Sequence, residues 1–226
     1  MNLQLARLLH LASPALPVGA FSYSQGLEWA VESGAVTNEA LAQQWISDAL
    51  HFALARCEAP ALIGLMRAWQ AGDSAEVQRL NAEFIATRET AELRAETLQM
   101  GYSLARLLRD LPDMPDRIRE THAGMTEIAF PTAWAAAAAH WQLGEEDAAT
   151  TYLWAWLENQ VMAAVKLVPL GQTAGQRMLV ALSPALTQLA ATAIERADAQ
   201  DWENFTPGMT LASSQHETQY TRLFRS

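Results

Sequence analysis

The sequence is poor in the residues on which several common chemistries depend. Its 226 residues contain one cysteine, Cys57, so no disulfide can form within the chain and a cysteine-rich zinc site lacks ligands. It contains one lysine, Lys166, against 14 arginines. The phosphate-binding pattern G-x-x-x-x-G-K-[ST] and the hydrolase pattern G-x-S-x-G are both absent. These absences argue against a P-loop nucleotide hydrolase and against a serine hydrolase.

Positive charge is also scarce. Lys and Arg number 15 against 25 Asp and Glu, which gives a formal net charge of −10. A nucleic-acid-binding surface or a polybasic membrane anchor would require the opposite balance, so we expect neither nucleic acid nor membrane as a partner. The longest apolar candidate span, residues 152–170, includes Glu158 and Lys166 and predicts a buried helix. No secretory leader is recognisable, and the expected location is the cytoplasm.

The histidines do not indicate a metal site. The five are His10, His51, His122, His140 and His216, and none is spaced from another or from Cys57 as metal ligands usually are. We therefore expect no metal site and no cofactor. Cys57 itself lies on an apolar helical stripe, which predicts a small core residue rather than a catalytic thiolate.

The composition predicts an all-α fold. Half of the residues are apolar, with Ala and Leu abundant and Gly and Pro few, and no period-2 alternation of β-branched residues is sustained. A chain of this length without a composition shift predicts one domain over residues 1–226. We expect a helical-bundle-like arrangement of about 8–10 helices. Residues 201–226 lack apolar periodicity and predict an irregular, extended C-terminal tail.

Capping residues and apolar spacing place several helices. Asn38 is a predicted N-cap for a helix whose apolar stripe is Ala42, Ile46, Ala49, Ala53 and Cys57. Pro60 predicts a kink or the start of a new helix. Asp73 predicts another N-cap, and apolar spacing over 77–105 predicts one helix of about nine turns. Pro131 is suited to the first turn of a helix over 132–143.

The predicted long helix carries two carboxylates at a spacing that suits either acid–base chemistry or a salt-bridged face. Glu92 and Glu96 stand four residues apart and are flanked by Arg88 and Arg94. Paired carboxylates can serve acid–base chemistry, but charges of both signs at this spacing are more typical of an exposed, salt-bridged helix face. We therefore predict a solvated face here.

Lys166 and the C-terminal tail resist a purely structural interpretation. Lys166 lies in an otherwise apolar stretch, where it either extends to solvent at a helix end or makes a functional contact. The tail ends with Leu223 and Phe224 between Arg222 and Arg225. Arginines and aromatic residues are common interface anchors, although a frayed terminus has a similar composition.

Four segments of the sequence resemble the urease accessory family UreF. They are residues 11–28 (LASPALPVGAFSYSQGLE), 88–94 (RETAELR), 158–172 (ENQVMAAVKLVPLGQ) and 216–226 (HETQYTRLFRS). They follow the order of the family from the first helix to the last residue. One departure is Ala20, which stands where a second glycine is frequent.

The resemblance implies a dimeric, non-enzymatic scaffold in the assembly of a nickel metallocentre. Such a protein joins the accessory protein UreD, also called UreH, to the nickel-binding GTPase UreG. The complex docks on apo-urease and couples GTP hydrolysis to nickel insertion. Two alternatives remain open: a helical enzyme or ligand-binding protein with a buried pocket, using Glu158 or His140, and a helical adaptor unrelated to urease.

Seven residues are the predicted partner contacts. The turn that contains Pro14, Pro17 and Gly19 is conformationally restricted, and it could present aromatic side chains to a partner at little entropic cost. We expect the tail to be mobile alone and to become ordered on the UreD/UreH-type partner. The predicted contacts are Phe21, Tyr23, Lys166, Tyr220, Arg222, Leu223 and Phe224.

Overall fold

The structure, a computed structural model that describes residues 3–226, confirms the all-α prediction. No strand occurs among these residues. The α-helices are α1 (Leu3–Ala12), α2 (Leu27–Glu32), α3 (Glu39–Ala49), α4 (Ala59–Ala71), α5 (Ser74–Ala86), α6 (Ala91–Asp110), α7 (Asp116–Ala123), α8 (Phe130–His140), α9 (Glu145–Leu167), α10 (Gln172–Leu182), α11 (Leu186–Ala199) and α12 (Pro207–His216). Short 3-10 segments form η1 (Ala20–Ser22) and η3 (Ser183–Ala185), and η2 (Leu50–Glu58) is a π-helix.

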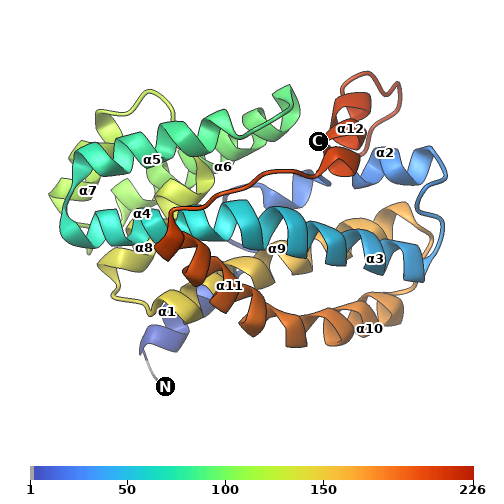
Figure 1. The fold of residues 1–226 in the computed structure, drawn as a ribbon, viewed down its shortest axis with the longest axis horizontal. Helices are drawn as coiled ribbons and strands as arrows, with labels where there is room; N and C mark the ends of the chain where they lie inside the picture. The colour runs from blue at the N-terminus through green and yellow to red at the C-terminus, as the bar shows by residue number, and fades with distance from the viewer. Residues whose placement is uncertain (1–2) are drawn as a thin grey trace.

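The core is built around α8. Its run of alanines is buried on every side, and a helix that is apolar all round belongs in a protein interior. α8 packs against α4 and α6, and α9 and α11 cover α4 further along the molecule (Figure 1). Trp69 of α4 is buried and donates its indole N–H to the carbonyl oxygen of Thr132, 3.1 Å away. This bond satisfies the one polar atom that a buried tryptophan brings into a core.

The predicted capping residues function as expected. The Asn38 side chain accepts a hydrogen bond from the Leu41 amide at 3.1 Å, and Asp73 accepts one from the Glu76 amide at 3.0 Å. The five residues of the predicted apolar stripe over 42–57 are all buried. Pro60 lies in the first turn of α4, and the helix continues through η2 without interruption. Glu39–Ala71 is thus one helical stretch. Pro60, which has no amide hydrogen to donate, stands where the π-helical segment η2 gives way to α4.

Two expectations about helices were wrong. The predicted nine-turn helix is divided at residues 87–90, where Thr87 ends α5 and the Thr90 side chain caps α6. Apolar spacing continues across this break because both helices face the same core. The tail is also not extended throughout, since it contains α12 after a short non-helical segment.

Two helical stretches are long and apolar enough to cross a membrane by length and composition: Glu39–Ala71 and Gln172–Ala199. Buried core helices pass the same test. In the first stretch 78% of the most apolar window is buried, whereas in the second only 39% is buried. The exposed residues of the second stretch are mostly polar, and Val180 is the large apolar side chain that it exposes.

We predict opposite effects of alanine at two helical glycines. A β-carbon at Gly101 in α6 would overlap the Ile128 carbonyl oxygen, so Gly101→Ala forces α6 away from the segment before α8. The expected loss of unfolding free energy is about 1–3 kcal/mol. At Gly64 in α4 the nearest atom would be 3.5 Å away, so Gly64→Ala should stabilise by up to about 1 kcal/mol. Urea denaturation measures both, and equal effects would contradict the close approach at Gly101.

Candidate partner-binding site

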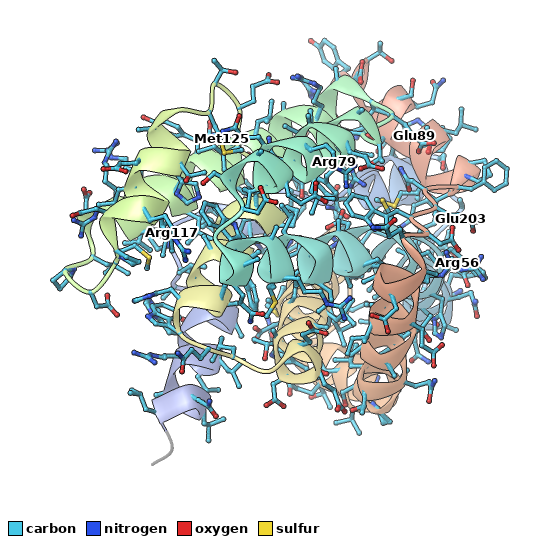
Figure 2. All side chains as sticks on the ribbon, turned by 60° about the vertical axis from the view of Figure 1, so that its left-hand side comes forward. Arg56, Arg79, Glu89, Arg117, Met125 and Glu203 are labelled. Atoms are coloured by element: carbon cyan, nitrogen blue, oxygen red, sulfur yellow. The ribbon has the colours of Figure 1, made fainter. Side chains whose placement is uncertain are left out.

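The C-terminal tail lies against the N-terminal part of the chain. From α11 the chain crosses the molecule as an extended segment and enters α12, which lies beside α2 (Figure 1). Residues 217–226 follow α12. The crossing segment is held to the body, because the Glu203 amide donates to the Arg56 carbonyl oxygen at 3.0 Å. The Asn204 side-chain amide donates to the Thr87 carbonyl oxygen at 2.9 Å. Figure 2 shows Arg56 and Glu203 side by side on this face, with the two charged groups 3.9 Å apart.

The carboxylate of Glu28 on α2 holds the tail. Its oxygens accept hydrogen bonds from the amides of Leu223 at 2.6 Å and Phe224 at 2.9 Å. The same group lies 3.0 Å from Nε2 of His216, which is fully buried. The hydrogen bonds from the two backbone amides offset the cost of burying this carboxylate. Glu28 thus fixes both the end of α12 and the residues that follow it.

Glu92 on α6 completes the arrangement. Its oxygens lie 2.7 Å from Nδ1 of His216 and 2.9 Å from the Arg222 guanidinium. Both ring nitrogens of His216 therefore face carboxylates. The group of Glu28, Glu92, His216 and Arg222 joins α2, α6 and the tail. We call these four residues the tail clamp.

The last residues pair with the N-terminal turn. The Arg225 amide donates to the Ser22 carbonyl oxygen at 2.8 Å, and the Ser24 amide donates to the Ser226 carbonyl oxygen at 2.7 Å. The Ser226 hydroxyl donates to Glu96 at 2.9 Å. These bonds bring the turn at 20–24 and the end of the chain into one surface, although they are about 200 residues apart in sequence.

The predicted solvated face of Glu92 and Glu96 was therefore wrong. The Glu92 side chain is only 11% exposed and belongs to the tail clamp, while Glu96 is buried and accepts from Gln25 and Ser226. The expected arginine partners bind elsewhere: Arg88 pairs with Glu58, and Arg94 pairs with Glu127. The tail that covers α6 lies more than 100 residues away, so helical spacing alone could not reveal it.

The predicted contact residues divide into exposed and buried sets. Phe21, Tyr220 and Leu223 are exposed, with Tyr220 fully so, and they are available to a partner. Tyr23 and Phe224 are buried, which corrects the expectation that both are presented at the surface. Tyr23 packs within the chain, and burial raises the pKa of its phenol.

The remaining two predicted residues join the tail to the body of the molecule. Arg222 is partly exposed and is held by Glu92. Lys166 lies in the last turn of α9 and is exposed, with Nζ 5.6 Å from the centre of the Phe224 ring. A cation over an aromatic face is attracted by the ring electrons. The structure thus brings Lys166, Arg222, Leu223 and Phe224 together with the turn that carries Phe21.

We also predict a pH effect at Glu96. Burial raises the pKa of this carboxyl from 4.5 to about 7, so the folded chain holds a proton there that the unfolded chain releases above pH 4.5. Stability should therefore fall as pH rises from 4.5 to 7, by about 3 kcal/mol at this site. His122 acts in the opposite direction, because burial lowers its pKa to about 4. Urea denaturation of wild type and Glu96→Gln at pH 5 and pH 7.5 isolates the Glu96 effect, and parallel pH profiles would contradict it.

Among residues 3–226 no group of three or more His, Cys, Asp or Glu side chains is placed to hold a metal ion. Cys57 is fully buried, as expected of a core residue, and burial raises the pKa of its thiol. His140, considered for a rival enzymatic function, lies at the end of α8 with Nε2 4.0 Å from Asp113. Glu158 lines a cavity elsewhere in the fold, whose lining residues do not include His140.

Comparisons with known proteins agree on one family. The profile of the UreF family matches residues 36–183. The urease accessory protein UreF of Azoarcus sp. (strain BH72) is 59% identical over 230 residues, covering 99% of this chain and 96% of that protein. The urease accessory protein UreF of Dechloromonas aromatica (strain RCB) is 57% identical over 228 residues, covering 99% and 98%. That of Methylobacillus flagellatus is 46% identical over 222 residues, covering 98% and 97%.

Proposed function

The chain belongs to the UreF family of urease accessory proteins, and we propose that it acts as a non-enzymatic scaffold in urease maturation. In this proposal it joins a UreD/UreH-type accessory protein to the nickel GTPase UreG in the cytoplasm, and the complex docks on apo-urease. GTP hydrolysis by UreG is then coupled to nickel insertion, which this chain regulates. The main observation in support of this proposal is a surface that the tail clamp assembles from three segments: the turn at 20–24, the end of α9 and residues 220–224.

The surface has the composition of a protein interface. Phe21, Tyr220 and Leu223 expose large apolar side chains, while Lys166 and Arg222 place positive charge beside them. Aromatic residues and arginine gain most free energy when a partner removes them from water. The tail clamp holds the backbone beneath these side chains, so less ordering entropy is lost on binding.

Recovery of the complex tests the proposal. The purified chain is mixed with a UreD/UreH-type protein and UreG, and complexes are separated by size-exclusion chromatography. Leu223→Asp should abolish the ternary complex and urease activation, because it places an unpaired charge at the centre of the surface. Leu41→Asp is the matched control, since Leu41 is exposed on α3, a helix that is not part of this surface. Full complex formation by Leu223→Asp would overturn the assignment of the surface.

Lys166→Ala tests the regulatory part of the proposal. The exposed ammonium contributes little to folding, so stability should change by less than about 0.5 kcal/mol. We expect the GTP hydrolysis rate of the complex, or its coupling to urease activation, to change. If Lys166→Ala changes neither the GTP hydrolysis rate nor urease activation, Lys166 is only a solvent-exposed residue at a helix end.

We also propose a homodimer whose interface covers the face of α10 that carries Val180. Val180 is 73% exposed, and it is the one large apolar side chain that the described residues of α10 and α11 expose. Stable homodimer interfaces resemble domain cores in composition. Light scattering at micromolar concentration should give twice the chain mass, and Val180→Glu should give the mass of one chain. A monomeric wild-type chain would contradict the proposal.

A further inference from the structure

A cavity of about 360 Å³ lies between the N-terminal turn, α6, α8 and α9. Most of its wall is apolar and includes Leu16, Val18, Leu93, Met100, Phe130 and Trp134. Pockets for small organic molecules have this size and are mostly apolar, with a few polar groups that fix the ligand. The scaffold function proposed above makes no use of the cavity.

Nearly all polar groups in the wall already have partners within the chain. The Arg88 guanidinium donates to Glu58 at 2.7 Å, and the hydroxyl of Tyr152 donates to the other Glu58 oxygen at 3.0 Å. Glu96 accepts one hydrogen bond at each oxygen, from Gln25 and from Ser226. At this polar end of the cavity Arg88 offsets the charge of Glu58, while hydrogen bonds from Gln25 and Ser226 hold Glu96, which has no ion-pair partner among residues 3–226.

Gln160 and Glu158 of α9 are the exceptions among the described lining residues, and Glu158 is only partly buried. Gln160 lines the cavity, it is only 2% exposed, and its side-chain amide makes no hydrogen bond to any residue within 3–226. The amide atoms of Gln160 are not among the fully enclosed side-chain atoms that lack a partner within residues 3–226, so they face accessible space in the cavity. A group of a ligand inside the cavity can therefore bond to them directly. The amide can both donate and accept, so it suits a carbonyl, a carboxamide or a hydroxyl.

The charges around the cavity select against ionic ligands. An anion would meet Glu58, Glu96 and, at the side of α9, Glu158, with Arg88 as the opposing charge already paired. A cation would have to lose its hydration beside a mostly apolar wall, and the buried carboxylates of Glu58 and Glu96 already accept hydrogen bonds from the chain. An uncharged molecule meets neither obstacle.

We propose that this cavity is a binding site for a small, uncharged, mostly apolar molecule whose single amide-, carbonyl- or hydroxyl-type group pairs with Gln160. The apolar wall supplies most of the affinity, and Gln160 sets the orientation. Binding at the inner face of the N-terminal turn also places the ligand beneath the surface that carries Phe21.

Calorimetry on the purified full chain with four matched probes tests the proposal. The probes are naphthalene-2-carboxamide, naphthalene, naphthalene-2-carboxylate and 2-naphthylmethylammonium, measured at pH 6, where both ionic probes are charged and Glu96, whose pKa burial raises to about 7, is mostly protonated. We expect the carboxamide to bind at least tenfold more tightly than each of the other three. Equal binding of carboxamide and hydrocarbon, tighter binding of either ion, or no binding of any probe would overturn the proposal.

Two variants test whether the probes bind in this cavity. Gln160→Leu keeps the size of the side chain and removes its amide, so carboxamide binding should weaken about tenfold while naphthalene binding changes less than twofold. Ala155→Met fills the cavity from α9 and should weaken both probes, whereas Gln99→Leu, at an exposed position on α6, should change neither. Carboxamide binding that survives both cavity variants would show that it occurs elsewhere. The assay contains no partner protein, so its failure is separate from failure of the scaffold proposal.

Discussion

Arg88→Ala is expected to lower the free energy of unfolding by about 3–5 kcal/mol. The guanidinium is 6% exposed and donates to Glu58 at 2.7 Å and to the Thr87 hydroxyl at 3.0 Å. It also lies 4.3 Å from the centre of the Phe84 ring. Truncation leaves the Glu58 carboxylate buried without its counter-ion, and that desolvation penalty dominates the expected loss.

Two further variants separate this cause from simple loss of packing. Arg79→Ala removes an exposed arginine that pairs with Glu76 and Glu83, and it should cost less than about 1 kcal/mol. The double variant Arg88→Met with Glu58→Gln removes both buried charges, so it should recover a large part of the loss. Urea denaturation reports all three. A double variant less stable than Arg88→Ala would show that the ion pair is not the cause.

Glu28→Ala is expected to release the end of the tail. It removes the acceptor of the Leu223 and Phe224 amides and one partner of His216. Each buried donor left without an acceptor costs about 1–3 kcal/mol, so exchange of the two amides should accelerate by at least a hundredfold. Hydrogen exchange of these two amides measures the effect directly.

The matched control for the tail clamp is Glu32→Ala on the same helix. Glu32 ends α2 and forms no ion pair among the residues that the structure describes. Amide exchange at 223 and 224 should stay at its wild-type rate in this variant. Equal acceleration by both variants would mean that α2 as a whole, rather than the Glu28 carboxylate, retains the tail.

Local signals in the sequence were sufficient for most of the fold. Asn38 and Asp73 cap helices because their side chains bond to amides three residues away, and the stripe from Ala42 to Cys57 is buried because its spacing matches one helix face. The break at 87–90 escaped prediction, since Thr90 is a modest cap and the apolar spacing continues across it.

The candidate site depended on contacts that leave no local pattern. Glu28 and Glu92 bind His216, yet 188 and 124 residues separate them from it. Resemblance marked residues 216–226 as important but could not show that they bind their own chain. The tail was predicted to be mobile alone because it has few periodic apolar residues. In the structure the tail is held by ion pairs and by hydrogen bonds of its backbone amides. Apolar periodicity does not detect contacts of either kind.

The proposed interface is tested most directly by the hydrogen-exchange footprint of a UreD/UreH-type partner on the full chain. If the tail clamp builds the binding surface, the partner should slow exchange at residues 20–26 and 217–226, and α3 should be unaffected. The Leu223→Asp variant should show no such footprint. Protection confined to other helices, with 20–26 and 217–226 exchanging as in the free chain, would contradict the account.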